Sequence, residues 1–146
     1  MTQTPKIIRH LRLVSSFALL ILLVGAALPA FAADGSVLHE GRWTKKGFDI
    51  EGSWSIVEEG GQRFVVLSDD FRTKSAPDLK LFLSPRAGSD VSSTNATRDA
   101  ARIGPIESHR GGQRIAIPAE VDLTGYETLV LHCEQYSKLW GVADLD

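Results

Sequence analysis

The residue best suited to chemistry in this sequence is Cys133, its single cysteine. A cysteine thiolate can exchange with disulfides or be oxidised to a sulfenic acid, and it can also bind haem iron. Each role needs an accessible thiol with a lowered pKa. Leu129 and Leu131 share one strand face with Cys133, because alternate side chains point the same way, and Glu134 beside it opposes ionisation. The pattern therefore favours a thiol that faces the core, and it leaves redox chemistry as the alternative.

The three histidines after residue 32 are not spaced like metal ligands. His132 adjoins Cys133 but points to the opposite face of the strand, so the two cannot readily bind one ion. His39 and His109 stand alone, and the sequence has no HExxH, CxxC or paired zinc pattern. We therefore predict no metal site, and we expect each histidine to be solvated or hydrogen-bonded.

Three aspartates, Asp69, Asp70 and Asp78, surround two turns. Oxygen-rich loops can hold calcium, but aspartates also bond the backbone of their own turn. The spacing is not that of an EF-hand, so turn chemistry is the better interpretation. Asn95-Ala96-Thr97 fits the N-glycosylation pattern, and a chance match in a loop is again the better interpretation.

The three tryptophans are candidates for lining a sugar or haem face. Trp54 falls on the apolar side of its strand, which indicates a core position. Trp43 lies among polar residues and is the best candidate for an exposed aromatic side chain. The sequence has no nucleophile elbow, Walker loop or dinucleotide fingerprint. Hydrolase and nucleotide-enzyme classes therefore have no support, and whether the protein is an enzyme stays open.

Short strands separated by turns must position these residues. Apolar and polar side chains alternate over 47–57, and Gly60-Gly61 predicts a tight hairpin after it. Residues 84–101 are typical of a loop, with room for one helical turn at 96–101. Further strands are predicted at 63–67, 79–83, 113–117, 128–133 and 138–143. This spacing predicts an all-β fold, a single antiparallel β-sandwich domain.

The N-terminal residues resemble a secretory signal peptide. A basic front that includes Lys6 and Arg9 precedes the apolar run 14–28, and Ala30 and Ala32 give a small-x-small cleavage pattern. The run is shorter than the roughly 20 apolar residues of a membrane span. We therefore predict a signal peptide over 1–32, a secreted or periplasmic location and no stable membrane span after cleavage. An uncleaved anchor is the alternative.

The remaining residues, 33–146, suit one domain. Three of the 16 basic residues and none of the 18 acidic residues precede residue 33, so the net charge of 33–146 is 13 − 18 = −5. Nucleic acid is therefore excluded as a partner, because phosphate binding needs a basic surface. A lone cysteine also excludes an internal disulfide.

Taken in order, a set of short pieces across the predicted domain resembles the electron-transfer DM-thirteen domain family. The pieces are Gly52, Asp70-Phe71, Ala76-Pro77-Asp78-Leu79, Ile103-Gly104-Pro105-Ile106, Gly112-Gln113, Ile117-Pro118, Tyr126, Leu131-His132-Cys133-Glu134 and Gly141-Val142-Ala143-Asp144-Leu145. The resemblance implies an extracytoplasmic β-sandwich with a characteristic cysteine. It also implies redox work, through a bare thiol or through a prosthetic group such as haem. Phe48 stands where members often carry a histidine, which weakens the haem interpretation.

These observations lead to two hypotheses. In the first, the protein is an exported redox or electron-transfer module with an unknown redox or protein partner. Cys133 is then the catalytic residue as a redox thiol, or the cofactor-binding residue as a ligand of haem. In the second, the protein is a non-catalytic extracytoplasmic binding or structural β-sandwich module, and Cys133 is buried in its core.

Overall fold

The computed structural model describes Met1 and residues 35–145. The predicted signal peptide, apart from Met1, and its cleavage site lie outside the described residues. The described residues contain no α-helix, only the 3₁₀ helices η1 (Gly88–Asp90) and η2 (Leu123–Gly125). None of the helical segments found in this part of the chain is long and apolar enough to cross a membrane.

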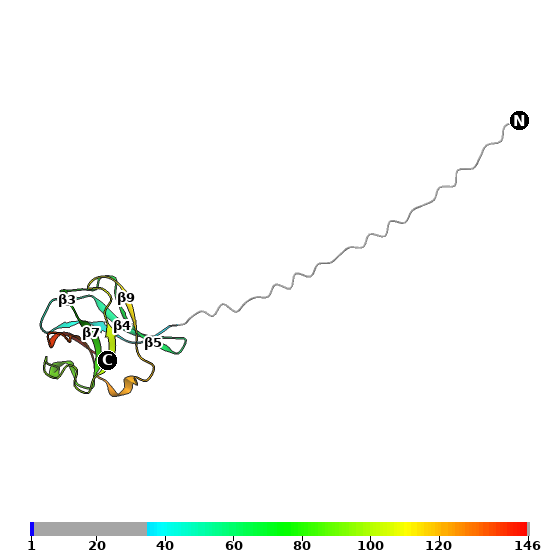
Figure 1. The fold of residues 1–146 in the computed structure, drawn as a ribbon. Coiled ribbons are helices and arrows are strands. Elements are labelled where there is room, and N and C mark those ends of the chain that lie inside the picture. Colours follow the sequence, from blue (N-terminus) through cyan, green and yellow to red (C-terminus); the bar gives the residue numbers. More distant parts are fainter. Residues whose placement is uncertain (2–34, 146) are drawn as a thin grey trace. The chain divides into compact units, whose positions relative to one another are not determined.

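The described residues form eleven strands in antiparallel sheets, which makes the fold an all-β sandwich, as predicted (Figure 1). The four-stranded sheet has the order β1 (Ser36–Arg42), β4 (Ser53–Glu59), β5 (Gln62–Leu67) and β9 (Gln113–Ala116). The five-stranded sheet has the order β2 (Thr44–Lys45), β11 (Lys138–Asp144), β10 (Thr128–Cys133), β7 (Leu79–Ser84) and β8 (Ala101–Pro105). A small sheet pairs β3 (Ile50–Glu51) with β6 (Arg72–Thr73).

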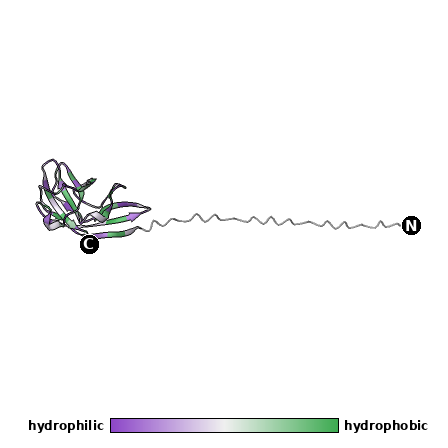
Figure 2. Ribbon diagram, turned by 90° about the horizontal axis from the view of Figure 1, so that it is seen from below, coloured by the Kyte–Doolittle hydropathy of each residue, from purple (hydrophilic) through white to green (hydrophobic). Residues whose placement is uncertain are grey.

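The main core lies between the two large sheets. Hydrophobic and hydrophilic residues alternate along the strands, so each strand turns one face inward (Figure 2). The central strand β10 contributes Leu129, Leu131 and Cys133 to this core, as the sequence predicted. All six residues of β10 are buried, so its other face must be covered as well.

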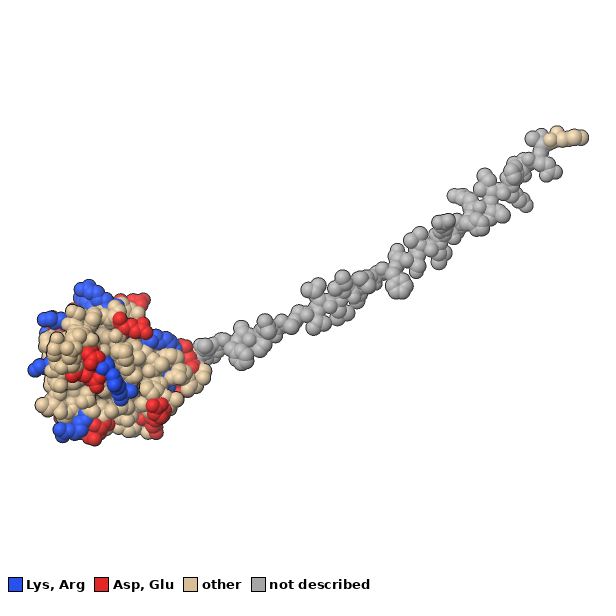
Figure 3. All heavy atoms as spheres, viewed as in Figure 1, with Lys and Arg blue, Asp and Glu red and all other residues tan. Residues whose placement is uncertain are grey.

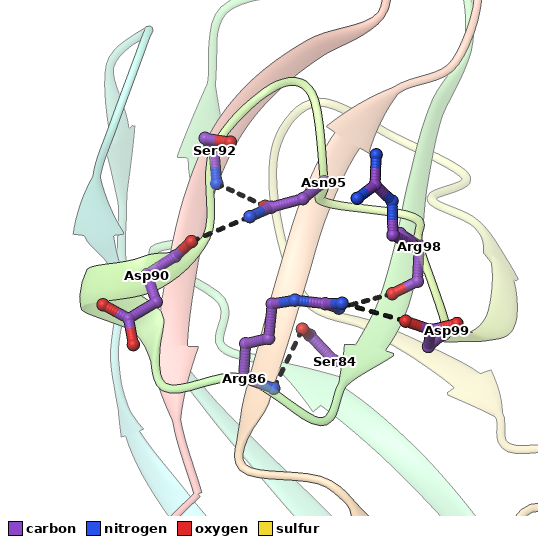
Figure 4. Close-up of polar contacts among 7 residues, drawn as sticks. All are labelled: Ser84, Arg86, Asp90, Ser92, Asn95, Arg98 and Asp99. Carbon is purple, nitrogen blue, oxygen red and sulfur yellow. Dashed lines mark hydrogen bonds and ion pairs between the residues drawn. The ribbon is translucent and has the colours of Figure 1, made fainter.

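The segment between β7 and β8 covers that other face. A second apolar cluster forms there from Phe82, Val91, Ala96, Val130, Leu139 and Val142. Asn95 shapes the segment, because its side-chain carbonyl accepts from the Ser92 N–H at 2.8 Å and its Nδ2 donates to the Asp90 carbonyl at 3.0 Å (Figure 4). The loop that the sequence predicted is therefore a packed cover, and Asn95 has a structural role in it.

The strand predicted over 47–57 is divided in two, and this boundary was wrong. Gly52 separates β3 from β4 with φ of +96°. A Cβ at Gly52 would lie 2.7 Å from the Phe71 Cα. The bend therefore needs glycine both for its positive φ and for this close approach. The Gly60-Gly61 hairpin is confirmed, with both glycines at positive φ between β4 and β5.

Four strands were missed, β1, β2, β6 and β8. β1 lies at a sheet edge and is largely exposed, so it lacks an apolar alternation. β8 is also an edge strand, which explains how it tolerates Pro105 after Gly104. The helical turn predicted over 96–101 was wrong, because hydrogen-bonded turns run to Asp99 and β8 begins at Ala101.

Candidate functional site

Cys133 is the last residue of β10 and lies at the end of the β10–β11 hairpin. Its strand neighbours are Leu79 on β7 and Lys138 on β11. It is 0 % exposed and belongs to the main core. The thiol is therefore held between the sheets, although its strand ends one residue before a surface turn.

The backbone just beyond Cys133 is clamped by charged side chains. The Glu134 N–H donates to the Asp78 carbonyl at 3.1 Å. Lys80, whose side chain is 13 % exposed, binds Asp78 at 2.6 Å and also binds Glu134. Arg102 approaches Glu134 at 3.3 Å. We call these four residues the Lys80 cluster, and hydrogen bonds to Asp78 and then Glu134 raise the pKa of Lys80.

The turn after the clamp is strained and exposed. Ser137 has φ of +50°, which a residue with a Cβ adopts at a cost of about 1–2 kcal/mol. Its N–H donates to the Glu134 carbonyl at 3.2 Å. Tyr136 in the same turn is 57 % exposed. This turn is the part of the hairpin whose opening would expose the end of β10.

His132 is buried, so it is not solvated, and its ring interacts with the Ser93 backbone. It is 3 % exposed, and neither ring nitrogen makes a hydrogen bond of normal geometry with any described residue. The ring meets Phe82 edge-on, with 6.2 Å between centroids. Burial lowers the pKa of His132, while the Ser93 backbone and Glu134 oppose the shift. The sequence suggested that this face of β10 meets solvent. The segment between β7 and β8 covers the face instead and buries the ring.

The other two histidines do not belong to β10. His109 Nε2 sits 3.3 Å from the Ala76 amide nitrogen and 3.1 Å from its carbonyl oxygen, so the hydrogen-bonded prediction is confirmed for His109. His39 is a half-buried residue of β1 opposite Ile56. Among the described residues, no group of three or more histidine, cysteine or acidic side chains could hold a metal ion.

The three aspartates are not gathered around a common point. Asp70 accepts a hydrogen bond from the Ser68 hydroxyl two residues before it, which is a side-chain contact within the turn and not the backbone bond that was predicted. Asp78 pairs with Lys80 in the cluster beside Cys133. Asp69 lies beside Gly112, where a Cβ would approach its carboxylate to 2.3 Å.

Trp43 is a core residue, and its prediction as an exposed aromatic was wrong. It is 9 % exposed and packs in the same cluster as Trp54, whose core position is confirmed. The polar neighbours of Trp43 in the sequence suggested an exposed side chain. Trp43 lies where the chain crosses from β1 to β2, and so from one sheet to the other, and this crossing places its ring in the core. Trp140 is also buried, and Phe48 stacks on it with 3.9 Å between centroids.

Haem does not fit around Cys133 in this structure. Its thiol is enclosed by apolar core residues, and Cys133 lines neither of two polar grooves on the described surface. His132, the adjacent imidazole, faces the opposite side of the sheet and packs against Phe82 from the second cluster. No step of a mechanism is therefore derived through haem.

The two grooves are polar and lie elsewhere. The larger, about 440 Å³, lies over the outer face of the four-stranded sheet and includes Arg42, Ser53 and Ser55. The smaller, about 250 Å³, lies over β3 and β6. Acidic and basic side chains are interspersed on the face seen in Figure 3. Sequence reasoning missed the smaller groove because its residues come from three segments that only the fold brings together.

Comparison with known proteins gives one match. A model of the family described as Electron transfer DM13 matches residues 43–145. No curated protein and no solved structure matches the chain.

Proposed function

The chain belongs to the Electron transfer DM13 family, and on that premise we propose that it is an electron-transfer module whose redox group is the thiol of Cys133. The family supports electron transfer in general terms. Cys133 is the single cysteine of the chain, so it is the only residue able to carry thiol chemistry. The proposal assigns the catalytic role to Cys133. It leaves haem out, because apolar core residues enclose the thiol.

The proposed reaction is thiol–disulfide exchange with a partner that carries a disulfide. The Cys133 thiol loses its proton to solvent, and its thiolate attacks one sulfur of the partner disulfide. A new sulfur–sulfur bond joins Cys133 to that sulfur, while the partner bond breaks and its second sulfur leaves as a thiolate with the electron pair. Cys133 is thus oxidised as the partner disulfide is reduced. The thiolate of a second thiol then attacks the partner sulfur of the mixed disulfide. A new disulfide forms between these two sulfurs, the bond to Cys133 breaks, and Cys133 leaves as a thiolate.

One observation carries the access route that this reaction needs: Cys133 is buried, yet it ends β10 directly before the exposed turn 134–137. A buried thiol cannot attack a partner until part of the chain opens. Opening the end of the hairpin requires release of the Lys80 cluster and of the Glu134 hydrogen bond to Asp78. We infer that the partner reaches Cys133 by this route.

The second candidate is a non-catalytic binding or structural module. The complete burial of Cys133 favours it, because free cysteines in cores are usually inert packing residues. In this case the Lys80 cluster only stabilises the hairpin. The candidate assigns no residue to catalysis.

The proposed location is secreted or periplasmic. The basic front, the apolar run 14–28 and the Ala30/Ala32 pattern support cleavage after Ala32. Intact-mass measurement of the exported protein tests this directly. A protein of full-length mass that remains with the membrane would overturn the location and favour the anchor.

The reactivity of the thiol in the folded protein separates the two functions. The redox proposal expects slow but measurable modification of Cys133 by a colorimetric thiol reagent in native buffer, and capture of a mixed disulfide with a small disulfide such as oxidised glutathione. Cys133→Ala is the control, because it removes the single thiol of the sequence and should abolish both signals. Modification that occurs only at denaturant concentrations that unfold the domain would refute the redox proposal and favour the structural module.

A further inference from the structure

A row of charged residues crosses the small sheet on one face. Glu51 on β3 pairs with Arg72 on β6, and Arg72 forms a β-bridge with Arg110 on its other side. Directly opposed residues share a face, so these three side chains lie side by side. Two arginines therefore stand next to each other, an arrangement of like charges that is unfavourable when nothing lies between them.

A second row lies beside the first. The Lys74 N–H donates to the Asp49 carbonyl at 3.2 Å, which places these two residues opposite each other. Together the rows line the groove of about 250 Å³, whose residues are Asp49, Glu51, Arg72, Thr73, Lys74 and Arg110. Lys74 and Arg110 are diagonal neighbours on this face. Such neighbours lie about 7–8 Å apart at Cα, within reach of long side chains.

The carboxylates of the groove are already paired. Glu51 binds Arg72 at 2.5 Å, and their hydrogen bond raises the pKa of Arg72. Asp49 binds Lys45, and their hydrogen bond lowers the pKa of Asp49.

Two cations of the groove form no ion pair with any described residue, although Lys74 lies close enough to Asp49 to interact with it electrostatically. In the described part of the chain, neither Lys74 nor Arg110 takes part in an ion pair, and the Lys74 ammonium lies 5.6 Å from the Phe48 ring centroid. The groove thus carries three basic and two acidic side chains, a net charge of 3 − 2 = +1. This positive groove lies in a domain, residues 33–146, whose net charge is negative.

The backbone that carries Arg110 is held in place before any ligand arrives. The Thr73 N–H donates to the His109 carbonyl at 2.9 Å, and the Gly111 N–H donates to the Phe71 carbonyl at 2.8 Å. The His109 ring is anchored at Ala76, as described above. A site whose scaffold is fixed loses less entropy on binding.

We propose that this groove binds a small oxyanion, phosphate or a compact carboxylate, between Arg110 and Lys74. The guanidinium fork of Arg110 matches two oxygens of such an anion, and Lys74 adds a point charge from the next row. The anion would lie beside the two neighbouring arginines and relieve their repulsion. The volume of the groove, about 250 Å³, suits a ligand of a few heavy atoms.

Calorimetric titration of the full domain tests the site, with inorganic phosphate and with malonate as separate probes. Sodium chloride holds the ionic strength constant and low, because exposed charges are screened by salt. Arg110→Gln and Lys74→Gln should each weaken binding by about tenfold or more, since each removes charge-assisted hydrogen bonding to the anion. Arg98→Gln is the matched control, because Arg98 is exposed and its side chain points away from the contacts of its loop (Figure 4).

Binding of phosphate or malonate that is lost in both groove variants and retained in the control supports the proposal and identifies the anion. Arg110→Lys should recover part of the affinity, which separates loss of charge from loss of fold. Equal heats for the wild type, Arg110→Gln and Arg98→Gln would show non-specific screening only and overturn the proposal. So would the absence of heat with both probes at low ionic strength. Thiol reactivity of Cys133 should not change in the groove variants, so this test is independent of the redox proposal.

Discussion

His132 and Cys133 are consecutive in β10 and lie on opposite faces of the five-stranded sheet, each of them buried. Cys133 faces the main core between the sheets, and His132 faces the segment that covers the sheet from outside. One buried strand thus places a thiol in the main core and an imidazole against the second apolar cluster. Substitutions at the two positions should therefore act on stability through different physical terms.

At Cys133, we expect serine to destabilise the domain more than alanine does. Serine would bury a hydroxyl beside Leu129 and Leu131, which should lower the free energy of unfolding by about 1–3 kcal/mol. Alanine removes that polar penalty and leaves only a small gap. Denaturant melts of both variants measure the difference. If the serine variant proves as stable as the wild type, the side chain at position 133 is in contact with solvent and is not buried in the core.

At His132, we expect a pH dependence of stability. Burial lowers the pKa of His132 below its ordinary value of 6.5, so the unfolded state binds more protons than the folded state. Stability therefore rises with pH, and the contribution of His132 is present above pH 6.5 and is lost as the pH falls below it. Melting temperatures of His132→Leu should show a shallower slope between about pH 7.5 and pH 5.

The control for this pH experiment is Val130→Ala, since Val130 lies in the same strand and in the second apolar cluster but has no titratable group. It should keep the slope of the wild type even if its overall stability changes. Identical slopes in the wild type and His132→Leu would mean that another group governs the acid limb.

At Lys80, we expect faster modification of the Cys133 thiol after Lys80→Gln. The change removes the partner of Asp78 and Glu134, so the end of the hairpin should open more often. Lys45→Gln breaks an exposed pair with Asp49 elsewhere and is the control. Pseudo-first-order rates with a thiol reagent decide the matter. Equal rates for the two variants would show that the Lys80 cluster does not gate access.

At the tryptophans, alanine should destabilise the domain at Trp43 as well as at Trp54. Both rings are buried in the main core, so each alanine variant should lose roughly 3–5 kcal/mol of unfolding free energy. Thermal or denaturant melts compare them. A loss of less than about 1 kcal/mol at Trp43 would restore the exposed assignment.

At Gly52, alanine should be poorly tolerated. It would require φ near +96° and would bring a Cβ within 2.7 Å of the Phe71 Cα, which should lower stability by about 1–3 kcal/mol. Gly125→Ala is the matched control, because a Cβ there meets nothing within 4 Å. A comparable loss in both variants would indicate a general effect of removing glycine.

The fold class could be predicted because alternation is a local property. The inward residues of β10 and the glycine hairpin after β4 follow from period two and from backbone conformation alone. β1 and β8 could not be predicted in the same way. As edge strands they bury few residues: β1 is largely exposed and β8 buries only Ile103, so their sequences look like loops.

The surroundings of the candidate site were only half predictable. The inward direction of Cys133 could be predicted from Leu129 and Leu131, which lie on the same face of the strand. The burial of His132 depends on a segment some 40 residues earlier in the chain, and that of Trp43 on a crossing between sheets. Such long-range packing leaves no periodic signal. The same reason hid the meeting of Arg110 with Arg72.

The position of the β10–β11 hairpin in the sheet has a consequence for how the domain folds. This hairpin comes last in the described chain, yet it occupies the middle of the five-stranded sheet, between β2 and β7. Neither flanking strand can complete its pairing until the hairpin inserts between them. Assembly of the larger sheet must therefore await the final strands. Because this pairing joins residues far apart in the sequence, we expect the sheet to close late and slowly during folding. Loss of β11 alone would leave β2 without a partner and uncover one edge of β10.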